Sequence, residues 1–466
     1  MQCTESFMVL LLNFQCVFTQ PSFLTFVKLM TGWVLSPRRR FVTELIGASG
    51  CIHDGHHSRY HRLFSAARWS LDTLCHVLAL MLVAVFAPTG DILIAVDDTL
   101  CRKRGLKVFG TGMHHDPLIS SRAKPLTSWG HDWVVLTLII QNPFWAPTKV
   151  FALPIGFRLY RNRQGVTKGK KKVTGKKKGQ PKPKKPKYDP NHRTRPELAV
   201  ELILLVSGWF PDRKFILTGD SAYGGGSVLQ KLPDNVELIS HVHPKGNLYE
   251  PAPKRDSGMK KSTKGPWPKK GKRLPTKEDW AADDSQPWKK LKFDQYGLHT
   301  TLLVKAIQAL YYKAGKDRLL TIVLTRDAEG KRPDQMFYCT CLDWSPRQIL
   351  SAYAARWAIE VTFENSKQYL GLEDPANRTE KAVRRTAPMA FVLYSLIVLW
   401  FHQVGHHHVR FPDRPWYPQK SEPSFADMLT TLRRMSWQEK LCTVRMQSSV
   451  AKKVFSPLIE FISLTG

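Results

Sequence analysis

The stretch ILIAVDDT, residues 92–99, decides the fold class of this chain. Its five leading apolar residues predict a central β-strand that is covered on both faces. The break Pro88-Thr89-Gly90 precedes this strand, and two aspartates, Asp97 and Asp98, follow its apolar part. The sequence therefore predicts a buried strand that delivers carboxylates at its edge.

A second apolar run, Lys214 to Thr218, leads in the same way to Gly219-Asp220. Further strands are expected at 133–140, 149–160, 236–242, 302–306, 319–324 and 336–341, and a helix at 196–206. Strands that alternate with helical segments predict an α/β fold. A turn or a helix cap is the alternative role for Asp97 and Asp220, since aspartate favours both.

A helix is expected from Ser345 to about Leu370. Ser345 is a good N-cap, Pro346 occupies the first helical position, and Gln348 completes a capping box. Gly371 is the expected C-terminal stop.

One face of this helix carries a pattern of charges. Tyr353, Glu360 and Lys367 are seven residues apart and share a face with Arg356. A core-facing stripe is expected on the other side, formed by Leu350, Ala354, Trp357 and Val361. The alternative is an exposed helix with ion pairs one turn apart, such as Arg356 with Glu360.

The order strand-Asp, strand-Asp, helix-Glu, with Y-x2-R-x3-E-x6-K around the glutamate, resembles the bacterial insertion-sequence transposases of the DDE superfamily. These transposases have an RNase H-like catalytic fold. The match has no gap or substitution at Tyr353, Arg356, Glu360 and Lys367. Asp97-Asp98-Thr99 fits the D-x-T motif of the first carboxylate, and Asp220 fits the second. The resemblance extends from about residue 22 to 434 and is weakest over two Lys-rich inserts.

The resemblance implies that Asp97, Asp220 and Glu360 are catalytic and hold two Mg²⁺ ions, for which Mn²⁺ substitutes. Three carboxylates from separate elements suit a hard cation that prefers oxygen ligands. Asp98 is the alternative to Asp97, and Glu364, one turn further along the helix, is the alternative to Glu360.

The resemblance also implies four DNA-binding residues. Tyr353, Arg356 and Lys367 are expected to grip phosphate near the cleaved end. Trp357 is expected to hold a flipped base, with packing in the core as the alternative.

The implied activity is transposition: metal-dependent cleavage at the ends of an insertion sequence, then transfer of the 3′-hydroxyl into target DNA. The expected partners are DNA and a second copy of the chain in a synaptic complex, in the bacterial cytoplasm at the nucleoid. A nuclease that cuts without joining, and an inactive nucleic-acid-binding relative, are the alternatives. A two-carboxylate glycosidase fits poorly with the charge of the chain.

The charge of the chain favours a polyanionic partner. Seventy Lys and Arg face 38 Asp and Glu, a formal net charge of +32. Two basic runs, 166–187 and 253–277, are expected to be solvated loops, and the first holds 11 Lys and no acid.

Three regions are expected. Residues 1–88 are a helical DNA-binding domain. Residues 89–375 are an RNase H-like catalytic domain with a β-rich insertion at about 232–342. Residues 376–466 are a helical C-terminal region.

The remaining composition argues against zinc sites and membrane spans. The eight Cys form no C-x-x-C pair, so reduced buried thiols are expected. Leu74–Phe86 and Met389–Trp400 are shorter than the roughly 20 residues of a membrane span and are expected to be core helices.

Overall fold

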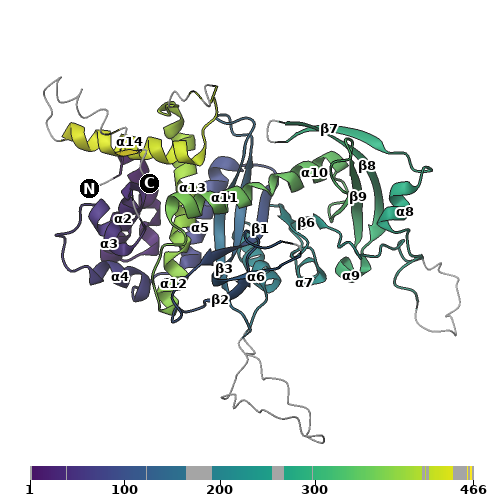
Figure 1. The fold of residues 1–466 in the computed structure, drawn as a ribbon, viewed down its shortest axis with the longest axis horizontal. Coiled ribbons are helices and arrows are strands. Elements are labelled where there is room, and N and C mark those ends of the chain that lie inside the picture. The colour runs from purple at the N-terminus through teal and green to yellow at the C-terminus, as the bar shows by residue number, and fades with distance from the viewer. Residues whose placement is uncertain are drawn as a thin grey trace, which may run out of the picture.

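The computed structural model of the chain describes residues 3–37, 39–121, 123–163, 192–253, 267–295, 298–411 and 419–443, with residues 415, 459, 462 and 463. The predicted loop 166–187 and residues 254–266 of the other basic loop lie outside the described residues. Figure 1 shows the N-terminal helices at one end of the molecule, the central strands in the middle and strands β7–β9 at the other end.

The chain up to the first strand is helical. It forms α1 (Glu5–Leu12), the 3-10 helix η1 (Asn13–Val17), α2 (Gln20–Leu35), α3 (Val42–Ala48), α4 (Ser58–Ser65) and α5 (Leu71–Phe86). Ser70 caps α5 by accepting a hydrogen bond from the backbone N–H of Thr73. Trp33 in α2 is fully buried, and its indole N–H donates to the carbonyl oxygen of Leu370, 2.8 Å away. The N-terminal helices therefore pack against the helical end of the catalytic region.

The strands form one ten-stranded sheet of order β2-β3-β1-β5-β6-β10-β9-β8-β7, with β4 paired to β3. They are β1 (Ile92–Arg102), β2 (Gly112–His115), β3 (Thr127–Gln141), β4 (Val150–Tyr160), β5 (Phe215–Gly219), β6 (Val236–His241), β7 (Lys289–Gln295), β8 (Leu298–Leu310), β9 (Leu319–Asp327) and β10 (Gln335–Cys339). All the strands expected from the sequence are present, and β2 and β7 are additional.

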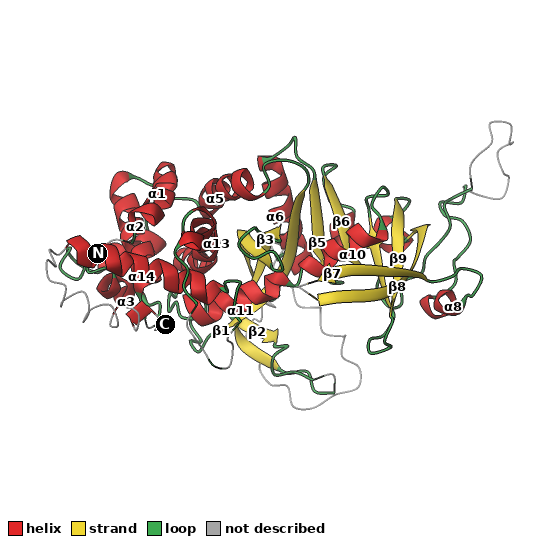
Figure 2. Ribbon diagram, turned by 90° about the horizontal axis from the view of Figure 1, so that it is seen from above, coloured by secondary structure: helices red, strands yellow, loops and turns green. Residues whose placement is uncertain are grey.

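Five of these strands form the core of the sheet. β3 is antiparallel to both β1 and β4, while β1, β5 and β6 run parallel. The helix α6 (Arg195–Trp209), with the Thr194–Glu197 capping box, and the helix α11 (Ala358–Leu370) lie on opposite sides of these strands (Figure 2). This arrangement confirms the predicted α/β fold with an RNase H-like core.

The strands of the expected insertion extend the core sheet instead of forming a separate one. β10 pairs antiparallel with β6, and β9, β8 and β7 follow outward. β6 itself pairs in parallel with β5, so it belongs to the core, although the predicted insertion begins before it. The edge strand β7, KKLKFDQ, is rich in lysine, as edge strands that avoid further pairing are.

Three short helices also lie in this part of the chain: α7 (Gly226–Leu229) precedes the predicted start of the insertion, and α8 (Lys277–Ala282) and α9 (Tyr312–Gly315) lie within it. After the sheet follow α10 (Pro346–Ala355), α11, α12 (Glu380–Thr386), α13 (Pro388–Gln403), the 3-10 helix η2 (Gly405–His407) and α14 (Phe425–Thr443).

Helix α13 is the core helix expected at Met389–Trp400. Phe391 stacks on Phe157 of β4 with ring centroids 5.4 Å apart, and the Ser395 hydroxyl donates to the Pro154 carbonyl oxygen. The helical stretch Glu380–Gln403 is long and apolar enough to cross a membrane, but 94% of its apolar window is buried inside the molecule. That burial is typical of the core helix of a folded protein.

Candidate active site

The pairing of β1 with β5 brings the two predicted aspartates together. Val96 lies beside Gly219 at the last pair of this parallel ladder, so Asp97 and Asp220 follow at the same level of neighbouring strands. Neighbouring strands are roughly 4.8 Å apart. The strand was expected to end within 96–99, but β1 continues to Arg102 along β3. The parallel pairing of β1 with β5 ends at Val96 and Gly219, so β5 no longer pairs with β1 beside Asp97.

Glu360, in helix α11, is linked to Asp97 by the side chain of Arg356, which contacts both carboxylates. The guanidinium of Arg356 lies 2.7 Å from Oδ2 of Asp97 and 3.4 Å from Oε1 of Glu360. The first strand and the catalytic helix are therefore joined by one cation that contacts a carboxylate on each.

Burial and mutual repulsion change the acidity of this group. Burial raises the pKa of Asp97 to about 7; Arg356 opposes this rise, while the carboxylates of Asp98 and Asp220 add to it. Burial also raises the pKa of Glu360, again against the effect of Arg356, and Asp220 adds to the rise. Arg356 thus offsets only part of the electrostatic cost of gathering these acids.

The three side chains fit a hard divalent cation by their chemistry, since all three offer carboxylate oxygens. As they stand, no three His, Cys, Asp or Glu side chains among the described residues are grouped closely enough to hold a metal ion. Asp97 and Glu360 converge on the Arg356 guanidinium instead of on a common point. A metal bound between them therefore requires that Arg356 turn aside.

Asp98, the alternative to Asp97, lies on the other face of β1, because successive residues of a strand point in opposite directions. Its Oδ1 accepts a 2.6 Å hydrogen bond from the Tyr223 hydroxyl, and its Oδ2 lies 3.3 Å from Nε of Arg195 at the start of α6. Arg195 also donates to the buried Asp132 at 2.6 Å. Asp98 thus belongs to a network of fixed partners on the α6 side.

Tyr223 links this network to the second aspartate. It is fully buried, and it lies in the turn in which Oδ1 of Asp220 accepts hydrogen bonds from the N–H groups of Ala222 and Tyr223. Asp220 therefore shapes its own turn, as one alternative proposed, and it also faces the acidic group. The roles of Tyr223, Arg195 and Asp132 could not be predicted from the sequence, because their partners are distant along the chain.

The single helix predicted around Glu360 is divided into α10 and α11, and the break changes which side chains face the core. At the junction of α10 and α11 the N–H groups of Arg356, Trp357 and Glu360 bond to carbonyls three residues earlier, which shifts the helical phase. The predicted core positions Trp357 and Val361 are in fact 53% and 42% exposed. The buried stripe of α11 contains Ile359 and Phe363 instead. The capping box at Ser345 and the left-handed Gly371 stop are confirmed.

Of the predicted DNA-binding residues, Tyr353, Arg356 and Trp357 lie together, and Lys367 lies apart from them along α11. The ring of Tyr353 packs edge-on against His241 and Phe337, with centroids 4.8 Å away in each case. A cavity of about 600 Å³ beside them is lined by Tyr353, Arg356 and Trp357. Lys367 lies two turns beyond Glu360 along α11. Its charge opposes the rise that burial causes in the pKa values of Cys101 and Asp132.

The fold places Asp97 in β1, Asp220 directly after β5 and Glu360 in a following helix, which is the order of acids expected of a nucleic-acid-cutting enzyme of the RNase H-like class. The chain belongs to the DDE superfamily of endonucleases: the model of the family described as "DDE superfamily endonuclease" matches residues 13–309. The match includes Asp97 and Asp220 and ends before Glu360. The predicted superfamily is confirmed.

Among solved structures, the chain is similar to a piggyBac transposase in a synaptic complex with hairpin DNA. The two are 12% identical with a TM-score of 0.38, and the likeness covers 95% of this chain and 76% of the other. No curated protein matches the chain.

Proposed function

We propose that this endonuclease is a DNA transposase that cuts at the ends of an insertion sequence and joins the 3′-hydroxyl to target DNA. Asp97, Asp220 and Glu360 form its acidic triad and hold two Mg²⁺ ions, with Mn²⁺ as a substitute. The observation that carries the proposal is the pairing of Val96 with Gly219, together with the Arg356 bridge from Asp97 to Glu360. Metal ions bound there would supply activation of the attacking oxygen and stabilisation of the departing one.

Arg356 has two roles in this proposal. Without DNA it pairs with Asp97 and Glu360 and favours their charged forms, against burial and the Asp220 carboxylate, which raise both pKa values. Its side chain also lines the cavity next to Tyr353 and Trp357, so a rotation away from the acids directs the guanidinium toward a phosphate there. Arginine suits this change of partner because its planar fork binds carboxylate and phosphate alike.

Tyr353, Trp357 and Lys367 complete the proposed DNA contacts. The exposed indole of Trp357 faces solvent beside the cavity, which favours stacking on a base over packing in the core. Lys367 supplies a cation further along the same helix. We further propose that two copies act together on two DNA ends in the bacterial cytoplasm, as the sequence resemblance implies.

The test is cleavage of a duplex that carries the DNA flanking the coding gene, with Mg²⁺, by wild type and Glu360→Gln. We expect Glu360→Gln to lower the cleavage rate at least about 10³-fold and to retain DNA binding, because a ligand to the metals is removed. Glu364→Gln is the matched control: Glu364 is exposed one turn along α11, and its change should leave the rate within about twofold of wild type. Undiminished cleavage by Glu360→Gln would refute the triad.

Joining is tested separately. A labelled, pre-cut end with a free 3′-hydroxyl is incubated with a supercoiled target plasmid and Mg²⁺. Insertion of the label into the plasmid is expected. Cleavage of the flanking duplex without any insertion would instead identify a nuclease that does not join.

A further inference from the structure

A cavity outside the active site is strongly basic. It has a volume of about 630 Å³ and lies between the start of α5, the end of β4, the start of α6 and helix α12. None of Asp97, Asp220 and Glu360 lines it. Its charged lining residues are Arg158, Arg161, Arg193, Lys381, Arg384, Arg385, Asp72 and Glu201.

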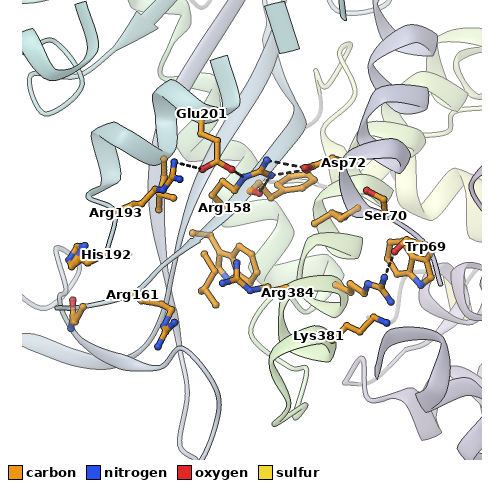
Figure 3. A pocket seen from close by; sticks show the side chains of 17 residues that line it. Trp69, Ser70, Asp72, Arg158, Arg161, His192, Arg193, Glu201, Lys381 and Arg384 are labelled. Carbon is orange, nitrogen blue, oxygen red and sulfur yellow. Dashed lines mark hydrogen bonds and ion pairs between the residues drawn. The ribbon is translucent and has the colours of Figure 1, made fainter. Parts of the chain in front are cut away.

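The two carboxylates in this lining are already engaged. Figure 3 shows Asp72 and Glu201 on either side of Arg158. Nη1 of Arg158 lies 2.8 Å from Asp72, and its Nε lies 2.7 Å from Glu201, which also meets Arg193 at 3.3 Å. The remaining cations of the lining therefore have no carboxylate from the cavity wall.

Three of those cations are poorly compensated. Arg161 forms no hydrogen bond or ion pair with a described residue, and its guanidinium lies over the Phe109 ring, 4.9 Å from the centroid. Among the described residues, Lys381 and Arg385 donate only to backbone carbonyl oxygens, those of Ala66 for the lysine and of Ala67 and Trp69 for the arginine. Burial lowers the pKa of Arg385, with no carboxylate to oppose the effect.

Buried donors in the same wall lack an acceptor. Trp133 is 1% exposed, and its indole N–H meets no acceptor among the described residues. The same is true of Nε of Arg161 within the described part of the chain, where Nδ1 of His192 also has no hydrogen-bond partner. Indole and guanidinium nitrogens can only donate, so the partner missing from this wall is an acceptor. Water would supply an acceptor, but it would not balance the positive charge.

We propose that this cavity binds a phosphate group. A phosphate offers several acceptor oxygens and negative charge at once, which matches uncompensated arginines and unpaired N–H groups better than a neutral ligand does. The phosphate belongs either to a DNA strand or to a free phosphate-bearing molecule. The proposal goes beyond the transposase assignment and does not depend on it.

The cavity has room beyond a single phosphate. A neighbouring cavity of about 840 Å³ shares the lining residues around Arg158 and continues along α6 to Lys231. The two cavities share Asp72, Arg158, His192, Arg193 and Glu201. The combined groove can therefore hold the groups on either side of a bound phosphate.

The experiment compares wild type with Arg161→Gln, Trp133→Phe and the control Arg410→Gln, all in metal-free buffer with EDTA so that metal-bound phosphate does not contribute. Arg410 is an exposed arginine that lines neither cavity. Calorimetry measures the affinity for inorganic phosphate and pyrophosphate, and fluorescence anisotropy measures the affinity for a labelled DNA duplex. Thermal melts confirm that each variant is folded; Arg161 is only partly buried, so its variant keeps the test valid if Trp133→Phe unfolds.

We expect Arg161→Gln and Trp133→Phe to weaken binding about tenfold, as the loss of a hydrogen bond to a charged group does, while Arg410→Gln has little effect. Loss of affinity for the free ions identifies a small phosphate ligand. If only the affinity for DNA falls, the bound phosphate belongs to a DNA strand. The salt dependence of DNA affinity should then fall by about one phosphate contact in Arg161→Gln. If both variants bind every probe as Arg410→Gln does, the proposal is wrong.

Discussion

Asp97 and Asp98 are consecutive residues of β1, yet the two faces of the strand surround them differently. Asp98 has fixed partners, Tyr223 from the Asp220 turn and Arg195 from α6. Asp97 has one cationic partner, Arg356, which is shared with Glu360. Burial raises both pKa values, to about 7 for Asp97 and about 6 for Asp98.

This difference indicates a structural role for the Asp98 face of β1 and a metal-binding role for the Asp97 face. On the Asp98 face the charges are balanced by residues of the same folded core, so that face can be rigid without any ligand. On the Asp97 face the balance comes from one long side chain that can turn away, so that face can exchange a protein cation for an external one. We therefore propose that Asp98 stabilises the folded core and that Asp97 binds a metal ion.

The largest effect expected from this comparison is on cleavage by Asp97→Asn and Asp98→Asn. Asp97→Asn should lower the cleavage rate by at least about 10³-fold without loss of fold, because it removes a metal ligand. Asp98→Asn should cost about 1–2 kcal/mol of unfolding free energy, because it weakens bonds to Tyr223 and Arg195, and should reduce cleavage far less. Denaturant unfolding and single-turnover cleavage measure the two effects. Equal loss of cleavage in both variants would remove the distinction between the faces.

A smaller effect is expected for Arg356→Gln. Loss of the guanidinium should reduce cleavage about 10²-fold, through a lost phosphate contact, while binding of Mn²⁺ stays equal or becomes tighter, because the competing cation is gone. Single-turnover kinetics and a Mn²⁺ titration separate these two consequences. Weaker Mn²⁺ binding would show that Arg356 supports the metal site and does not compete with it.

The smallest effect is expected for Tyr223→Phe, which removes the hydroxyl that joins the Asp220 turn to Asp98. Cleavage should fall about tenfold because the Asp220 turn is held less firmly, and unfolding free energy should fall by about 1–2 kcal/mol. A positioning role predicts that the cleavage loss persists at temperatures where the variant is fully folded. Cleavage that matches wild type under those conditions would limit Tyr223 to stability.

The sequence predicted the parts of the site that depend on local pattern. The runs before Asp97 and Asp220 are strands, and Ser345 and Gly371 bound the helical segment that carries Glu360. The break near Arg356 was not predicted, because no proline or glycine marks it, and it places Trp357 outside the core.

The contacts between distant residues could not be predicted in this way. Tyr223 and Asp98 are 125 residues apart, and their hydrogen bond depends on how β1 and β5 pair. The junction of β6 with β10 likewise joins the insertion to the core through a pairing that neither strand's own sequence specifies.

Electron paramagnetic resonance tests the acidic triad directly, by counting bound Mn²⁺ with DNA present for wild type and for the triple variant Asp97→Asn, Asp220→Asn, Glu360→Gln. We expect two tightly bound ions in the wild type and none in the triple variant. The same number of tightly bound ions in both proteins would contradict this expectation, because the metals would then lie elsewhere.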